Sequence, residues 1–128
     1  MKIIVIAVLL LVAVLYFMFP FVEVVGLSMF PTYNDKDILL SRRVLFKKLH
    51  KYKPGEVYVF KAPYEDDDAR FIIKRVSFLY SANRSVKLYM LGDNSSNSYD
   101  SRYYGAVDCN FVVSKVLIKL GGDKNGRA

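Results

Sequence analysis

The stretch FIIKRVSF, residues 71–78, carries the alternation that decides the fold. Side chains of an extended strand point alternately to its two faces, so Ile72, Lys74 and Val76 share one face. An ammonium group between two aliphatic side chains is poorly hydrated, and desolvation lowers the pKa of a lysine. The stretch therefore predicts a β-strand that holds one lysine in apolar surroundings. The alternative is a lysine whose charged head reaches out to solvent.

Other stretches rich in Val, Ile, Tyr and Phe are bounded by Pro, Gly, Asn and Asp, which is typical of strands and turns. They are Ile38–Leu45, Glu56–Lys61, Ser85–Leu91 and Phe111–Leu120. KPGEV around Gly55 predicts a turn that enters a strand, and SANRS from Ser81 predicts the bend of a hairpin. Helical periodicity is weak. We expect a mainly β fold, a small antiparallel sheet or barrel-like domain over residues 23–120.

The N-terminal stretch Ile3–Val22 contains 20 consecutive residues without a charge. A helix of that length extends roughly 30 Å, the thickness of a bilayer's hydrocarbon core. The sequence therefore predicts an N-terminal transmembrane anchor over residues 1–22. A cleaved signal peptide is the alternative, but its apolar region is usually shorter and ends in small residues. The polar, glycine-rich segment 121–128 is expected to be a disordered tail.

The composition restricts the classes of partner and cofactor. A net charge of +7 suits an anionic membrane surface or a nucleic acid, but no basic run or aromatic ladder supports nucleic acid as a partner. A single cysteine, Cys109, excludes an internal disulfide and is expected to be a buried apolar residue. With one cysteine and one histidine a zinc site is implausible, and no cofactor is predicted. The acidic run Tyr64–Asp68 fits a cation site, although an exposed turn is the commoner reading.

The segment GLSMFPT, residues 26–32, contains Ser28, which is separated from the end of the predicted membrane span by the five residues 23–27. A nucleophile there can reach only substrates at the membrane surface, because each extended residue covers about 3.5 Å. By itself the segment also fits an ordinary turn. A nucleophilic serine needs a base. His50 lies among lysines and is expected on the surface, whereas Lys74 has the apolar setting that a neutral amine requires.

The segment LGDNSSNSYDSRYYG, residues 91–105, is dense in side chains that form local hydrogen bonds. It places Asp93 and Asp100 opposite Arg75 and Arg102 as candidate ion pairs. As a calcium loop it lacks the glycine at the sixth position and the closing glutamate.

Taken together, GLSMFPT, FIIKRV and GDNSSNSYDSRYYG, in this order after an apolar N-terminal segment, resemble the signature segments of the type I signal peptidases. The resemblance covers most of the chain up to about Gly105. It implies that Ser28 is the nucleophile and Lys74 the general base. Lysine at this position resembles the bacterial and organellar branch, since the endoplasmic-reticulum type carries histidine. The resemblance implies supporting roles for Ser98, which would orient the lysine amine, and for an ionic scaffold of Asp100, Arg102, Asp93 and Arg75.

The resemblance implies a membrane-anchored serine endopeptidase that removes signal peptides from exported preproteins. By similarity, Val24, Met29 and Ile72 line pockets for small residues before the cleavage site. The implied partners are preprotein signal peptides, the lipid bilayer and the secretion translocon. The implied location is the inner or cytoplasmic membrane, single-pass, with the catalytic domain on the extracytoplasmic side. The oxyanion is expected on the Ser28 N–H, and Gly26 stands where some relatives have a hydroxyl.

Two departures from the family pattern concern the segment after KRV. The chain continues with SFLYSANRSVKLY instead of a Gly-Pro-Gly-Asp-like turn, and the extra subdomain of larger relatives is absent. Two other classes stay open: an inactive membrane-tethered β-domain that binds partners, and a self-cleaving Ser-Lys relative of the repressor type. The N-terminal anchor and the SRYYG segment disfavour the repressor type.

Overall fold

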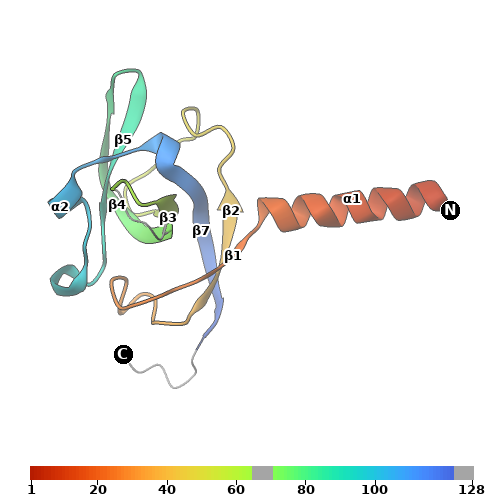
Figure 1. The fold of residues 1–128 in the computed structure, drawn as a ribbon, viewed down its shortest axis with the longest axis horizontal. Helices are drawn as coiled ribbons and strands as arrows, with labels where there is room; N and C mark the ends of the chain where they lie inside the picture. Colours follow the sequence, from red (N-terminus) through yellow and green to blue (C-terminus); the bar gives the residue numbers. More distant parts are fainter. Residues whose placement is uncertain (65–70, 123–128) are drawn as a thin grey trace.

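The computed structural model describes residues 1–64 and 71–122, and the strands in these ranges form a single antiparallel sheet in the order β1-β2-β7-β3-β4-β5-β6 (Figure 1). The strands are β1 Phe21–Glu23, β2 Ile38–Arg43, β3 Val57–Lys61, β4 Phe71–Ala82, β5 Ser85–Leu91, β6 Val107–Asp108 and β7 Val112–Gly121. Every pair of neighbours is antiparallel. The prediction of a mainly β fold is confirmed.

The five predicted strands are observed as β2, β3, β4, β5 and β7. Five short elements were not predicted: β1, β6, the one-turn helix α2, Ser101–Tyr104, and the 3₁₀ helices η1, Ser95–Asn97, and η2, Cys109–Phe111. Elements of two to four residues are too short for a hydrophobic period to develop. Gly121, which was assigned to a disordered tail, is instead the last residue of β7, paired with Ile38. The rest of that tail beyond residue 122, and residues 65–68 of the acidic run, lie outside the described residues.

Strand β3 lies near the middle of the sheet and contributes to two apolar cores. Tyr58 and Phe60 belong to one buried cluster, and Val57 and Val59 to the other. Alternate residues of a strand point to opposite faces, so burial of both sets means that the sheet is covered on both faces here. The neighbouring strand β4 is positioned by this doubly packed strand.

Strands β4 and β5 form the predicted hairpin. Ala82 pairs with Ser85, and the two residues between them, Asn83 and Arg84, have φ of 53° and 62°. Two consecutive residues with positive φ form the turn whose twist matches that of the flanking strands. The hairpin sets the pairing of β4 with β5, whereas the place of Lys74 is set by its pairing with Tyr58 of β3.

The N-terminal helix α1, Lys2–Met18, extends away from the sheet (Figure 1), and none of its residues is buried. The helix predicted over Ile3–Val22 is too long. Pro20 has no N–H to continue the helical hydrogen bonds, and the chain then forms β1, where Phe21 pairs with Leu40 of β2. Among the described residues, no helix has the combined length and apolar character needed to cross a membrane.

Candidate active site

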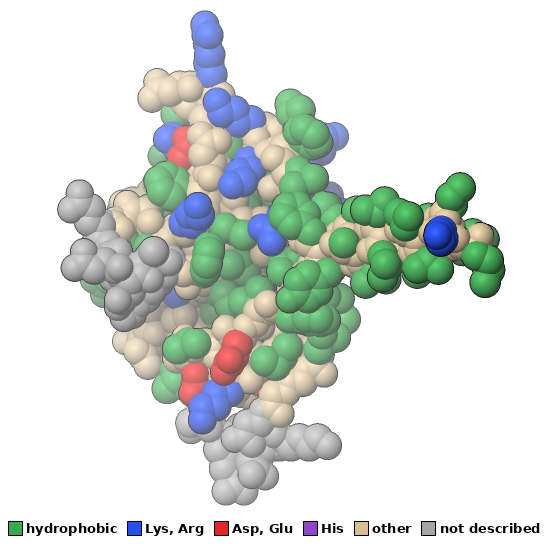
Figure 2. Space-filling view, turned by 45° about the vertical axis from the view of Figure 1, so that its right-hand side comes forward, with side chains coloured by type: hydrophobic (Ala, Val, Ile, Leu, Met, Phe, Trp, Pro, Cys, Tyr) green, Lys and Arg blue, Asp and Glu red, His purple; other side chains and the backbone are tan. Residues whose placement is uncertain are grey.

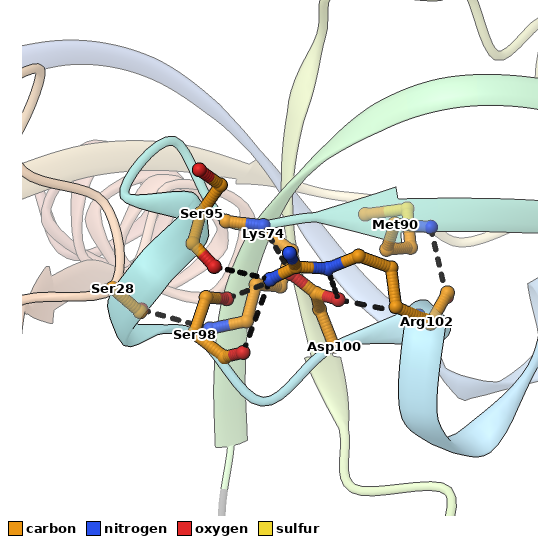
Figure 3. A network of polar contacts seen from close by, with 9 residues as sticks. Ser28, Lys74, Met90, Ser95, Ser98, Asp100 and Arg102 are labelled. Atoms are coloured by element: carbon orange, nitrogen blue, oxygen red, sulfur yellow. Dashed lines mark hydrogen bonds and ion pairs between the residues drawn. The ribbon is translucent and has the colours of Figure 1, made fainter.

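Ser28 and Lys74, which are 46 positions apart in the sequence, meet in the folded chain. The Lys74 Nζ donates a hydrogen bond of 2.8 Å to the Ser28 Oγ. Ser28 lies in the turn that follows Leu27 between β1 and β2, and Lys74 lies on β4 opposite Tyr58 of β3. Figure 3 shows the two side chains directed at each other. The predicted nucleophile and base are thus in the contact that proton transfer requires.

The Lys74 side chain is held almost out of solvent, with Lys74 only 5% exposed. Burial lowers the pKa of the Lys74 ammonium from 10.5 to about 8, although the Asp100 carboxylate acts in the opposite direction. With such a pKa about a tenth of the amine is neutral at pH 7. Within the described residues no carboxylate forms an ion pair with Lys74. The amine is therefore available as a proton acceptor near neutral pH.

Asp100 is fully buried, and its carboxylate is occupied by other donors. It accepts hydrogen bonds from the Gly92 N–H at 3.0 Å, the Ser98 Oγ at 2.8 Å and the Arg102 Nε at 2.9 Å. It also caps α2 by accepting from the Arg102 N–H. Burial by itself raises the pKa of the Asp100 carboxyl, but the hydrogen bonds from Arg102, Gly92 and Ser98 outweigh it and lower the pKa to about 2.

Ser98 does not bind the lysine as the family resemblance implies. Its hydroxyl donates to the Asp100 Oδ2, and no hydrogen bond between Ser98 and Lys74 is found in the part of the chain that the structure describes. The hydroxyl has one hydrogen to donate, and a charged carboxylate is the stronger acceptor for it. In this structure Ser98 is connected to the lysine environment through Asp100.

Arg75 and Asp93 form the second predicted ion pair. The Arg75 Nε and Nη2 bind the two Asp93 oxygens at 2.9 and 2.8 Å, and the Arg75 Nη1 donates to the Gly55 carbonyl at 2.6 Å. This bidentate pair joins β4 to the loop that follows β5. Since Arg75 and Lys74 are adjacent on a strand, the pair braces the face opposite the lysine.

Two site residues were missed at the sequence level, Gly92 and Asn94. The Asn94 N–H donates to the Ser28 carbonyl at 2.9 Å, and the Asn94 Nδ2 donates to the Leu27 carbonyl at 3.1 Å. A Cβ on Gly92 would lie 2.1 Å from the Ser98 Oγ and 2.7 Å from the Ser28 carbonyl oxygen. The sequence GDN at residues 92–94 is typical of a turn, but it does not indicate that the turn packs against the Ser28 segment.

A groove of about 620 Å³ runs along the pair and is lined by Ser28 and Lys74. The three predicted pocket residues, Val24, Met29 and Ile72, all line it. Among the described residues the Ser28 N–H has no hydrogen-bond acceptor, whereas the nearby Gly26 N–H donates to the Asp35 carboxylate and the Phe30 N–H donates to the Leu27 carbonyl. An extended peptide in the groove would therefore meet a free N–H beside the hydroxyl.

His50 and Cys109 lie away from the groove lining. His50 is only partly exposed, in contrast to the surface position expected, and its Nε2 lies 2.9 Å from the Tyr58 hydroxyl oxygen. Tyr52 packs edge-on against the ring of His50. Cys109 is buried, as predicted, beside Ser85.

Comparison with known proteins agrees with this geometry. The family model described as signal peptidase, peptidase S26, matches residues 1–79 and 84–120. The Mus musculus protein named mitochondrial inner membrane protease subunit 1 is 27% identical over 111 residues, which cover 74% of this chain and 65% of that protein. The match thus leaves about a third of the relative's length without a counterpart. Because the family model covers nearly the whole described chain, the protein belongs to the S26 family of signal peptidases.

Proposed function

We propose that this chain is a serine endopeptidase that removes signal peptides from preproteins, with Ser28 as nucleophile and Lys74 as general base. The observation that carries the proposal is the 2.8 Å hydrogen bond between the Lys74 Nζ and the Ser28 Oγ, beside an open groove. A buried amine with its pKa lowered to about 8 supports the assignment of the base.

In the proposed reaction, the neutral Lys74 amine takes the Ser28 proton as the Oγ attacks the scissile carbonyl carbon. The negative charge that develops on the carbonyl oxygen is stabilised by the Ser28 N–H. The Lys74 ammonium then gives its proton to the leaving amine, the C–N bond breaks, and an acyl-enzyme remains. A water molecule, deprotonated by Lys74, hydrolyses the ester and restores Ser28. Gly26 offers no hydroxyl, so any second donor to the oxyanion comes from elsewhere.

The lining of the groove supports a proposal for the substrate class. Val24 and Met29 are almost fully buried and Ile72 partly so, and all three line the groove with apolar side chains. We propose that the substrates are preproteins with small residues, such as alanine, before the cleavage site.

Membrane association is part of the proposal. The 17 residues of α1 are apolar on all sides apart from Lys2 and are packed against nothing along most of its length. A helix that is hydrophobic all round is normally buried in a protein core or in lipid, so we propose that α1 inserts into a bilayer. Signal peptides inserted in the same bilayer would be held at a high effective concentration. The extracytoplasmic position and a translocon partner stay predictions.

The test uses the full chain in detergent with a preprotein that carries an Ala-X-Ala site. We expect one cut after the second alanine, identified by mass spectrometry, and no cut by Ser28→Ala. The rate should rise with pH through about 8, where the Lys74 amine becomes neutral. Binding of the preprotein without cleavage by the unmodified chain would instead indicate an inactive binding domain, and cleavage of the chain itself would indicate the repressor type.

A further inference from the structure

The turn between β2 and β3 holds large apolar side chains in solvent. In residues 44–50, which we name the apolar turn, Leu45 is 52% exposed, Phe46 72% and Leu49 81%. Three such side chains within five positions form an exposed patch, a feature that marks an interaction site in soluble domains.

The apolar turn is held in this conformation by hydrogen bonds. The N–H groups of Leu49 and His50 both donate to the Phe46 carbonyl, at 3.1 and 2.9 Å, and the Tyr52 hydroxyl donates to the Lys47 carbonyl at 2.7 Å. The Val44 N–H donates to the Val113 carbonyl of β7 at 3.0 Å. The exposed side chains are therefore presented by a fixed backbone.

The apolar turn lies beside the C-terminal end of α1. A hollow of about 390 Å³ is lined by Met18 of α1 together with Leu45, Phe46 and Leu49. The connection is braced by Arg43, whose Nε donates to the Phe17 carbonyl at 3.0 Å and whose guanidinium lies 4.3 Å from the centre of the Phe17 ring. Figure 2 shows hydrophobic side chains gathered around the base of α1, with basic side chains among them. A bilayer that receives α1 meets the apolar turn at the same level.

Basic residues alternate with the apolar ones in this turn. Lys47 and Lys48 separate Phe46 from Leu49, and Lys51 follows. No acidic residue occurs between Ile38 and Lys53. Apolar side chains with interspersed lysines match the boundary between acyl chains and anionic headgroups.

We propose that the apolar turn is a second membrane contact, in which Phe46 and Leu49 enter the acyl boundary and Lys47 and Lys48 bind anionic headgroups. This inference rests on the proposed insertion of α1. Two contacts, one through α1 and one through the apolar turn, would restrict the tilt of the catalytic domain more than α1 alone. The groove is then held at a set orientation toward the bilayer.

The chain contains no tryptophan, so a single introduced tryptophan reports its own surroundings. The full-length variants Phe46→Trp and Leu49→Trp are placed in phosphatidylcholine vesicles, with or without phosphatidylglycerol, whose acyl chains are brominated. Tyr16→Trp reports α1, and Phe78→Trp reports the β4–β5 hairpin, on the side of the sheet away from α1 (Figure 1).

We expect the emission of Phe46→Trp and Leu49→Trp to be blue-shifted and quenched in the anionic vesicles, and that of Phe78→Trp to be unquenched. Adding Lys47→Gln or Lys48→Gln to Phe46→Trp should each lower the ratio of docked to undocked protein roughly fivefold. Quenching of Tyr16→Trp without quenching of the two turn variants would overturn the second contact and leave α1 insertion intact. Absence of quenching in Tyr16→Trp would overturn the proposed insertion itself. A blue shift that depends on protein concentration and not on bromine would assign the apolar turn to a second copy of the chain.

Discussion

The β4–β5 hairpin carries two lysines, Lys74 on β4 and Lys87 on β5. Each lies near an aspartate, but their pKa values are shifted in opposite directions. Lys87 Nζ lies 2.8 Å from the Asp108 Oδ2, and this hydrogen bond raises the pKa of the Lys87 ammonium. Lys74 also lies in the field of an aspartate, Asp100, yet its amine binds the Ser28 hydroxyl and its pKa is lowered to about 8.

The first difference is burial, which lowers the pKa of Lys74, whereas the Lys87 side chain is partly exposed. The second difference lies in the partners of the two carboxylates. The Asp100 side chain accepts five hydrogen bonds, three of them from Arg102, and its charge is largely balanced by that guanidinium. Asp108 accepts from Lys87 and from the N–H of Asn110. A buried lysine can therefore act as a base beside a carboxylate when other groups already bind that carboxylate.

The largest expected effect tests whether only one of the two lysines is catalytic. Lys74→Ala should lower kcat/KM for an Ala-X-Ala preprotein by roughly four orders of magnitude or more, as loss of a catalytic base does elsewhere. Lys87→Ala, the matched control, should leave kcat/KM within about twofold, because Lys87 lies outside the groove lining. Comparable losses in both variants would mean that the loss reflects folding, which circular dichroism of the two variants would reveal.

The next effect concerns stability. The unfolded chain has a Lys74 pKa of 10.5 and the folded chain one of about 8, so between these values the unfolded state binds more protons and stability rises with pH. At pH 7 the buried ammonium costs about 3 kcal/mol. Lys74→Met should therefore raise the free energy of unfolding at pH 7 by up to about 3 kcal/mol, measured by urea titration, and the gain should shrink toward pH 10. A variant less stable than the parent at pH 7 would contradict the burial cost.

The third prediction concerns a variant in which the surroundings of Lys74 become more like those of Lys87. In Arg102→Met the Asp100 charge is no longer balanced, so its attraction should raise the pKa of the Lys74 ammonium. The midpoint of the rate against pH should move to higher pH by roughly one unit, with cleavage recovered in alkaline buffer. A loss of rate at every pH with an unmoved midpoint would mean that Arg102 only supports the fold.

The smallest expected effect concerns Ser98. Ser98→Ala removes one of the five hydrogen bonds to the Asp100 carboxylate, so the midpoint should shift by less than about half a pH unit and the rate fall by no more than about tenfold. A rate loss equal to that of Lys74→Ala would restore the direct contact with the lysine that the family resemblance implies. Pre-steady-state rates at several pH values separate the two outcomes.

The residues that could be read from the sequence are those whose role follows from a period or a motif. The alternation in FIIKRVSF predicted both β4 and the buried face of Lys74, because side-chain direction in a strand depends only on position. The GLSMFPT motif singled out Ser28. The relative position of Ser28 and Lys74 could not be predicted, since it depends on the β3–β4 pairing and on the segment after β5.

The parts that could not be predicted depend on competition between partners. The hydroxyl of Ser98 has two acceptors within reach in principle, and only the fold determines that it takes Asp100. Similarly, the apolar composition of residues 3–22 does not indicate where the helix ends. The end is set by the start of β1, in which Phe21 pairs with Leu40 of β2. Asn94 acts through hydrogen bonds to the Leu27 and Ser28 carbonyls, and Gly92 through the absence of a side chain beside the Ser28 carbonyl. Neither role follows from a periodicity.

The tether between Asn94 and the serine loop determines when during synthesis the chain can become active. Ser28 leaves the ribosome early, its amine partner 46 residues later, and the segment that holds the loop in place later still. A nascent chain that ends before β5 therefore contains the Ser28 hydroxyl without a base aligned to it. The proposed peptidase would therefore stay inert until β5 and the segment after it have been synthesised and folded.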